Sequence, residues 1–143
     1  MAQVTKHTIS CIVQNHPGAL SRIAGSFAEK GINIRSLSVG ELEHEDASRM
    51  TIVVKTPADV LADIVAHLKG LPDVIDVDDL EKSELIEREL LLIKVKAQGE
   101  DISRVMQLVE IFRATVVGMG QDTLTIEMTG PESKVNALVN LLH

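Results

Sequence analysis

The stretch QNHPGALSRIAGSFAEKGINI, residues 14–34, has the residue types of a small anion-binding turn. Asn15 and the pair Pro17-Gly18 stand where an amphipathic helical pattern begins. The N-terminus of a helix presents unpaired N–H groups and a partial positive charge, which attract a carboxylate. Gly18 leaves room for close approach, and the amide of Asn15 can both donate and accept hydrogen bonds. Because no acidic side chain occurs at positions 14–20 to repel it, we expect this turn to suit the carboxylate and ammonium groups of an α-amino acid.

The same residues have a purely structural interpretation, which the sequence leaves open. Pro17 and Gly18 can simply open a helix, and the side chain of Asn15 can satisfy free N–H groups near its start.

Residues for catalysis or metal binding are not grouped in this sequence. The histidines at positions 7, 16, 44, 67 and 143 lack metal-ligand spacing. The acidic run 41–46 lacks the glycine and the ligand order of a calcium loop, and no glycine-rich nucleotide loop occurs. Cys11 lies in an apolar alternation, which is typical of a buried structural thiol. We therefore expect no catalytic residue and no metal site.

Composition and charge exclude several classes of partner. The net charge of −7 and the presence of only 2 Phe and no Tyr or Trp disfavour an RNA-binding ferredoxin-like domain, which needs a basic face and stacking aromatics. The chain has neither an apolar run long enough to span a membrane nor a hydrophobic signal segment. A single cysteine fits a reducing compartment, so we expect a cytoplasmic protein.

The first half of the chain shows a regular succession of patterns. Alternation with a period of two predicts strands, and apolar spacing of three and four predicts helices. The predicted strands are 7–14, 32–39, 50–54 and 74–77, and the predicted helices are 20–28 and 60–68. The order β-α-β-β-α-β is that of the ferredoxin-like fold, with both helices on one face of an antiparallel sheet. A change of phase at Arg35–Ser36 indicates a bulge, and the acidic stretch 41–48 indicates an exposed hairpin tip.

The second half repeats this succession. The charged segment 80–89 indicates a boundary between a domain at 1–80 and a domain at 81–143. Strands are then predicted at 91–95, 116–117 and 124–128, and helices at 102–112 and 131–142. The fold class is therefore α+β with two tandem ferredoxin-like βαββαβ domains, the second lacking its last strand and hence truncated in this chain.

The two halves also align through LSRI at 20–23 and ISRV at 102–105. This alignment places Ala97 opposite Asn15 and Glu100 opposite Gly18. A carboxylate side chain would repel an anionic ligand, so we expect one ligand site per chain, in the first half.

A longer pattern extends the interpretation. The segment NHPGALSRIAGSFAEKGINIRSLSVG, followed by SRMTIVV and ERELLLIKV, closely resembles the regulatory (small) subunits of acetolactate synthase, also called acetohydroxyacid synthase. The resemblance extends over essentially the whole chain, and its specific part is the turn N-x-x-G-A-L combined with G-x-N-I-x-S-L. Two departures are the pair His16-Pro17 and Arg35, which stands where an acidic residue is common.

The resemblance implies an N-terminal ACT domain that binds an amino acid, followed by an ACT-like domain. Such subunits bind valine or another branched-chain amino acid (leucine, isoleucine) between the two chains of a homodimer. By matching of the motif, the resemblance implies a ligand-binding site formed by Asn15, Gly18, Ala19 and Leu20 of one chain and by Asn33 and Ile34 of its neighbour.

The resemblance also implies a separate catalytic (large) subunit, which the small subunit activates and makes sensitive to feedback inhibition in branched-chain amino acid biosynthesis. Thiamine diphosphate, FAD and magnesium are expected on that catalytic partner, and no cofactor is expected on this chain. The alternative is a free-standing ACT-type amino-acid sensor with no acetolactate synthase partner.

Overall fold

The computed structural model describes residues 3–82 and 84–143, apart from the side chain of Lys82. The chain divides into two compact units, with the division between Leu85 and Ile86.

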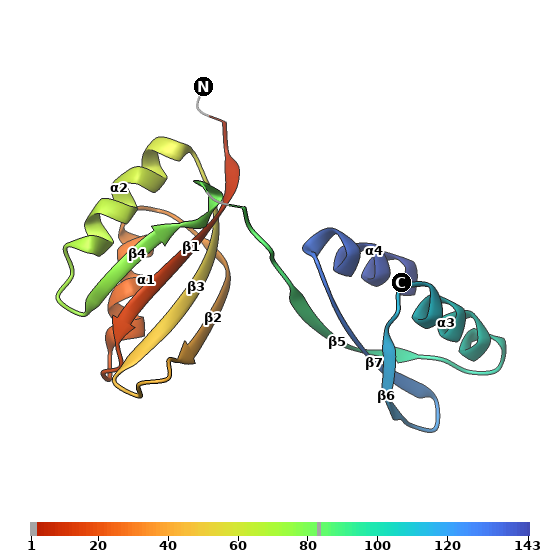
Figure 1. The fold of residues 1–143 in the computed structure, drawn as a ribbon. Helices are drawn as coiled ribbons and strands as arrows, with labels where there is room; N and C mark the ends of the chain where they lie inside the picture. Colours follow the sequence, from red (N-terminus) through yellow and green to blue (C-terminus); the bar gives the residue numbers. More distant parts are fainter. Residues whose placement is uncertain (1–2, 83) are drawn as a thin grey trace. The chain divides into compact units, whose positions relative to one another are not determined.

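The first unit has the predicted β-α-β-β-α-β order (Figure 1). Its elements are β1 (Thr5–Gln14), α1 (Ala19–Glu29), β2 (Ile34–Glu41), β3 (Ala47–Thr56), α2 (Ala58–Lys69), β4 (Val74–Asp79) and the short 3-10 helix η1 (Leu80–Lys82). The strands form an antiparallel sheet in the order β2-β3-β1-β4, and α1 and α2 lie on one of its faces. This arrangement is the ferredoxin-like fold.

The core of the first unit lies between this sheet and the two helices. It is almost entirely aliphatic, and Phe27, fully buried on α1, is its one aromatic side chain. The inward residues of β1 and β3 alternate along each strand, since successive side chains point to opposite faces of a sheet. The apolar core residues on these strands are Ile9, Cys11, Val13, Met50, Ile52 and Val54.

Strand β2 forms one edge of the sheet and carries the predicted bulge. Its register against β3 shifts between Ile34 and Ser36, which confirms the change of phase seen in the sequence. After the bulge, Leu37 lies opposite Ile52 and Val39 opposite Met50, yet Leu37 is 40% exposed and Val39 46% exposed. The edge strand therefore presents apolar side chains to its surroundings.

The second unit has a β-α-β-β-α order. Its elements are β5 (Glu89–Lys96), α3 (Glu100–Ile111), β6 (Thr115–Met119), β7 (Thr123–Gly130) and α4 (Glu132–Leu142). The three strands are antiparallel in the order β5-β7-β6, and the described part of this unit holds no fourth strand. Ile126 and Leu138 are its most deeply buried side chains.

None of the helices among the described residues has the length and apolar character needed to cross a membrane.

Candidate functional site

The turn between β1 and α1 is built around a glycine in the left-handed region. Helix α1 begins at Ala19, and its N-cap, Gly18, has φ of 87°. The N–H of Ala19 donates to the carbonyl of His16 at 3.2 Å, and no side chain caps the helix. Within the described residues, the N–H groups of Leu20 and Ser21 make no backbone hydrogen bond. The helix start therefore offers free donors, as an anion site requires.

Asn15 has a different role from the helix cap that its sequence position allows. Its Nδ2 donates to the carbonyl oxygen of Glu45 at 2.9 Å and to Oε1 of Glu41 at 3.3 Å. Its backbone N–H donates to the carbonyl of Asp46 at 2.9 Å. The interpretation of Asn15 as a cap for the helix is therefore wrong, because the residue ties the end of β1 to the β2–β3 loop.

Two charged residues that the sequence interpretation missed lie at the same turn. Arg22, in the first turn of α1, donates from Nε to Oδ2 of Asp73, and its Nη2 lies against the same oxygen. Nδ1 of His16 lies 3.8 Å from Oδ1 of Asp73. Although positions 14–20 hold no acidic residue, the fold brings Asp73 and Glu41 to the turn from distant parts of the chain. The cationic residue in the first helical turn was visible in the sequence, whereas its partner was not.

Both the neighbouring side chain and the backbone conformation restrict position 18 to glycine. A Cβ atom built on it would lie 3.1 Å from Nη1 of Arg22. A side chain at position 18 would therefore crowd the guanidinium group and strain the left-handed backbone.

The remaining predicted site residues fall into two groups. Ala19 is buried and Leu20 is 44% exposed, both beside the turn. Asn33, which is exposed, and the half-buried Ile34 lie at the opposite end of the sheet. Because Ile34 pairs with Val54 whereas Glu41 pairs with Ser48, the two groups are separated by the length of β2, about 23 Å for its 8 residues. A single chain does not bring them together.

The helix that follows the corresponding turn in the second unit begins one residue earlier. Residues 15–18 connect β1 to α1, whereas residues 97–99 connect β5 to α3. β5 ends 82 positions after β1 (Lys96 and Gln14), and α3 ends 82 positions after α1 (Ile111 and Glu29), so the structure keeps Glu100 opposite Gly18, as the alignment of LSRI with ISRV predicts. Helix α3 begins one residue earlier than α1 in this alignment, and its N-cap is Gly99, with φ of 56°. Glu100 therefore opens the helix itself, and Ala97 is buried. An acidic first turn remains the feature that distinguishes this turn from the first one.

Cys11 is excluded as a nucleophile by its environment. It is fully buried, and burial, together with the nearby Asp76, raises the pKa of its thiol to about 11. The thiolate is the reactive form, and almost none is present at neutral pH. Among the described residues, no group of three or more His, Cys, Asp or Glu side chains could hold a metal ion.

With the geometry of the turn established, comparison with known proteins is decisive. Residues 9–76 match the family of AHAS small subunit-like ACT domains, and residues 88–143 match the family described as the small subunit of acetolactate synthase. A probable acetolactate synthase small subunit of Archaeoglobus fulgidus is 44% identical over 138 residues, which cover 96% of this chain and 86% of that relative. The chain belongs to the acetolactate synthase small-subunit family. Its role is that of a non-catalytic, regulatory subunit.

Other relatives agree with this membership. The acetolactate synthase small subunit of Mycobacterium avium is 43% identical over 137 residues, covering 96% of this chain and 82% of that one. The crystal structure of the acetolactate synthase small subunit from Thermotoga maritima superposes with a TM-score of 0.86 at 38% identity, covering 96% of this chain and 86% of that one. The ACT fold predicted for this small subunit is therefore confirmed.

The burial of Cys11 gives a prediction that depends on pH. A thiol reagent such as DTNB, supplied at pH 8, should modify Cys11 of the folded small subunit at least a hundredfold more slowly than in the unfolded chain. Because its pKa is raised, the Cys11 thiol of the folded state keeps its proton as pH rises from 9 towards 11, whereas the thiol of the unfolded chain loses it. The free energy of unfolding should therefore fall across that pH window. Equal labelling rates in the folded and unfolded chains would show that the thiol is accessible.

Gly18 gives a second prediction, on stability. Gly18→Ala should lower the free energy of unfolding of the first unit by about 1–2 kcal/mol, because it places a Cβ in the left-handed region. Gly25→Ala is the matched control within the same helix, since only open space surrounds its added Cβ, and it should raise stability by about 0.5–1 kcal/mol. Hydrogen exchange of the amides of β1 and β3 in the full chain measures both effects. A neutral or stabilising Gly18→Ala would contradict the strain argument.

Proposed function

We propose that this small subunit is the amino-acid sensor of acetolactate synthase. It binds valine, or another branched-chain amino acid, at the turn before α1, activates the catalytic subunit and confers feedback inhibition on it. The family membership supports the regulatory role, and the geometry of the edge strand supports the position of the ligand.

The observation that carries this proposal is the position of the two groups of site residues along β2. Asn15 lies at the Glu41 end of this edge strand, and Asn33 precedes its other end. A two-fold axis that sets β2 of a second copy antiparallel to β2 reverses the direction of the second strand. The Asn33 end of one chain then meets the Asn15 turn of the other, and two identical sites form.

The surface of β2 is suited to such an interface. Leu37 and Val39 are exposed on the edge strand although they lie opposite core residues of β3. An edge strand also leaves one row of backbone N–H and C=O groups without a partner in the sheet. A second copy would cover both the apolar side chains and the strand edge.

Each part of valine finds a matching group in this arrangement. Its carboxylate meets the free N–H groups of Leu20 and Ser21 at the start of α1. The amide oxygen of Asn15 accepts from its ammonium group, while Nδ2 of Asn15 continues to hold the loop. Its isopropyl group packs on Leu20 and on Ile34 of the second copy. A dissociation constant between millimolar and micromolar corresponds to about −4 to −8 kcal/mol, which lies within the ceiling of about −1.5 kcal/mol per atom for so small a ligand.

The catalytic chemistry is assigned to the large subunit. Thiamine diphosphate, FAD and magnesium are proposed to bind there, and this chain supplies only the regulatory contacts. Inhibition then requires valine to bind one arrangement of the holoenzyme more tightly than the other, because a ligand with equal affinity for both shifts nothing.

The holoenzyme tests the proposal directly. Adding this chain to the catalytic subunit of the same organism should raise its activity, and valine should lower the raised activity. Gly18→Asp should abolish valine inhibition while activation persists, because a carboxylate side chain at position 18 would pair with Arg22 where the ligand carboxylate must approach. Gly99→Asp is the matched control, since Gly99 is also a helix N-cap glycine with positive φ, and it should leave inhibition unchanged.

Two other results of this experiment would contradict parts of the proposal. Wild-type valine affinity in Gly18→Asp, measured by calorimetry, would remove the turn from the site. Valine binding by a chain that neither binds nor activates the catalytic subunit would favour the free-standing sensor instead.

Mixed dimers test the cross-chain geometry. Each proposed site combines Asn15 of one chain with Asn33 of the other. In a dimer of one Asn15→Ala chain and one Asn33→Ala chain, both substitutions therefore lie in the same site, and the second site should stay intact. Calorimetry should therefore give about half the wild-type stoichiometry, whereas either homodimer should have no intact site. Asn140→Ala, an exposed position on α4, is the control and should keep full stoichiometry. A mixed dimer with no site, or with two, would show that Asn15 and Asn33 do not share a ligand.

A further inference from the structure

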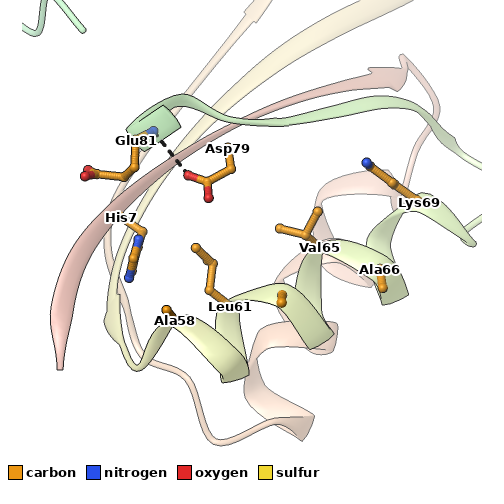
Figure 2. Close-up of a pocket in the computed structure, with 9 residues that line it drawn as sticks. His7, Ala58, Leu61, Val65, Ala66, Lys69, Asp79 and Glu81 are labelled. Carbon is orange, nitrogen blue, oxygen red and sulfur yellow. Dashed lines mark hydrogen bonds between the residues drawn. The ribbon is translucent and has the colours of Figure 1, made fainter. Parts of the chain in front are cut away.

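A second concave surface of the first unit lies away from the turn before α1. This groove has a volume of about 590 Å³ and lies between α2 on one side and β1, the end of β4 and η1 on the other (Figure 2). Its lining residues are His7, Ala58, Leu61, Ala62, Val65, Ala66, Lys69, Asp79 and Glu81. None of them belongs to the proposed valine site.

The wall formed by α2 consists of small and apolar side chains. Ala58, Ala62 and Ala66 recur every four residues, so they lie on one face of the helix, and all three are exposed. Leu61 and Val65 form the deeper part of this wall. Small side chains allow another backbone to approach the helix closely, and the 12 residues of α2 extend over about 16 Å.

The two ends of the groove carry opposite charges. Lys69 is the last residue of α2, whereas Asp79 and Glu81 lie near the start of α2, because β4 runs back along that helix. Figure 2 shows the amino group of Lys69 on one side of the groove and the carboxylates of Asp79 and Glu81 on the other. The charged groups of an α-amino acid are carried by one carbon atom, so such a ligand cannot reach both ends.

His7 adds an unsatisfied polar group at the acidic end. Its side chain lines the groove and is 8% exposed, and its Nε2 hydrogen-bonds to Oγ1 of Thr5 at 2.8 Å. Its Nδ1 is buried and has no hydrogen-bond partner among the described residues.

We infer that this groove docks a short amphipathic segment of the catalytic subunit, about three helical turns long. Apolar side chains of the segment lie on the alanine face of α2, an acidic residue meets Lys69, and a basic residue meets Asp79 and Glu81. This inference rests on the proposed function, which supplies the partner, and it adds the surface by which the regulatory unit holds that partner. The separation of charge and the length of the apolar wall favour a polypeptide over a small metabolite.

The experiment measures the affinity of the full chain for the catalytic subunit of the same organism. Ala62→Arg fills the middle of the groove and should raise the dissociation constant at least tenfold. Ala137→Arg changes another exposed alanine, on α4; it is the matched control and should change the dissociation constant less than twofold. Calorimetry with valine on each chain alone should give wild-type affinity for both variants, which also shows that they are folded. In a second measurement, reductive methylation of Lys69 in the wild-type chain should be slowed in the complex.

The outcomes separate the two proposals. A wild-type chain with no affinity for the catalytic subunit overturns the proposed function itself. Wild-type binding that Ala62→Arg leaves unchanged, with Lys69 equally reactive in the complex, overturns only the docking groove. Loss of valine binding in Ala62→Arg would make the groove part of an effector site and would likewise overturn the inference.

Discussion

The structure of the first unit depends on the antiparallel register of β1, β3 and β2. Gln14 pairs with Ala47 and Glu41 with Ser48, so β1 and β2 end at the same end of the sheet, on either side of β3. Asn15 then reaches both Glu41 and Glu45. A shift of this register by one residue would also turn the buried residues of β3 to the opposite face, so packing of the core holds the register in place.

The order of the strands gives the two edges different properties. β2 is an edge strand with exposed apolar residues, and the residues proposed for the ligand site lie near its two ends. The other edge is formed by β4, and the groove with opposite charges lies between its end and α2. We propose that the first edge is used for a second copy and an effector, and that the groove is used for the catalytic partner.

The two units show how one supersecondary pattern supports different surfaces. Both turns before the first helix use a glycine with positive φ as N-cap, because neither backbone could reverse there easily with a side chain. The first helix has no acidic residue in its first turn, whereas α3 begins with Glu100 and Asp101. The acidic side chains interact with the helix dipole of α3, which leaves its N-terminus less suited to an external anion.

The sequence by itself determined the order of elements, the bulge in β2, the aliphatic core and the family. These features depend on local periodicity and on short motifs, which a sequence displays directly. The tertiary structure decided which groups surround the turn. Asp73 reaches Arg22 across 51 positions, and Glu41 and Glu45 reach Asn15 across 26 and 30, so no local pattern could place these contacts. The start of α3 also needed the structure, because a match of LSRI with ISRV does not show that this helix begins one residue earlier, with Gly99 as its N-cap. Contacts between distant segments depend on strand order and register, and these are fixed only when the core packs.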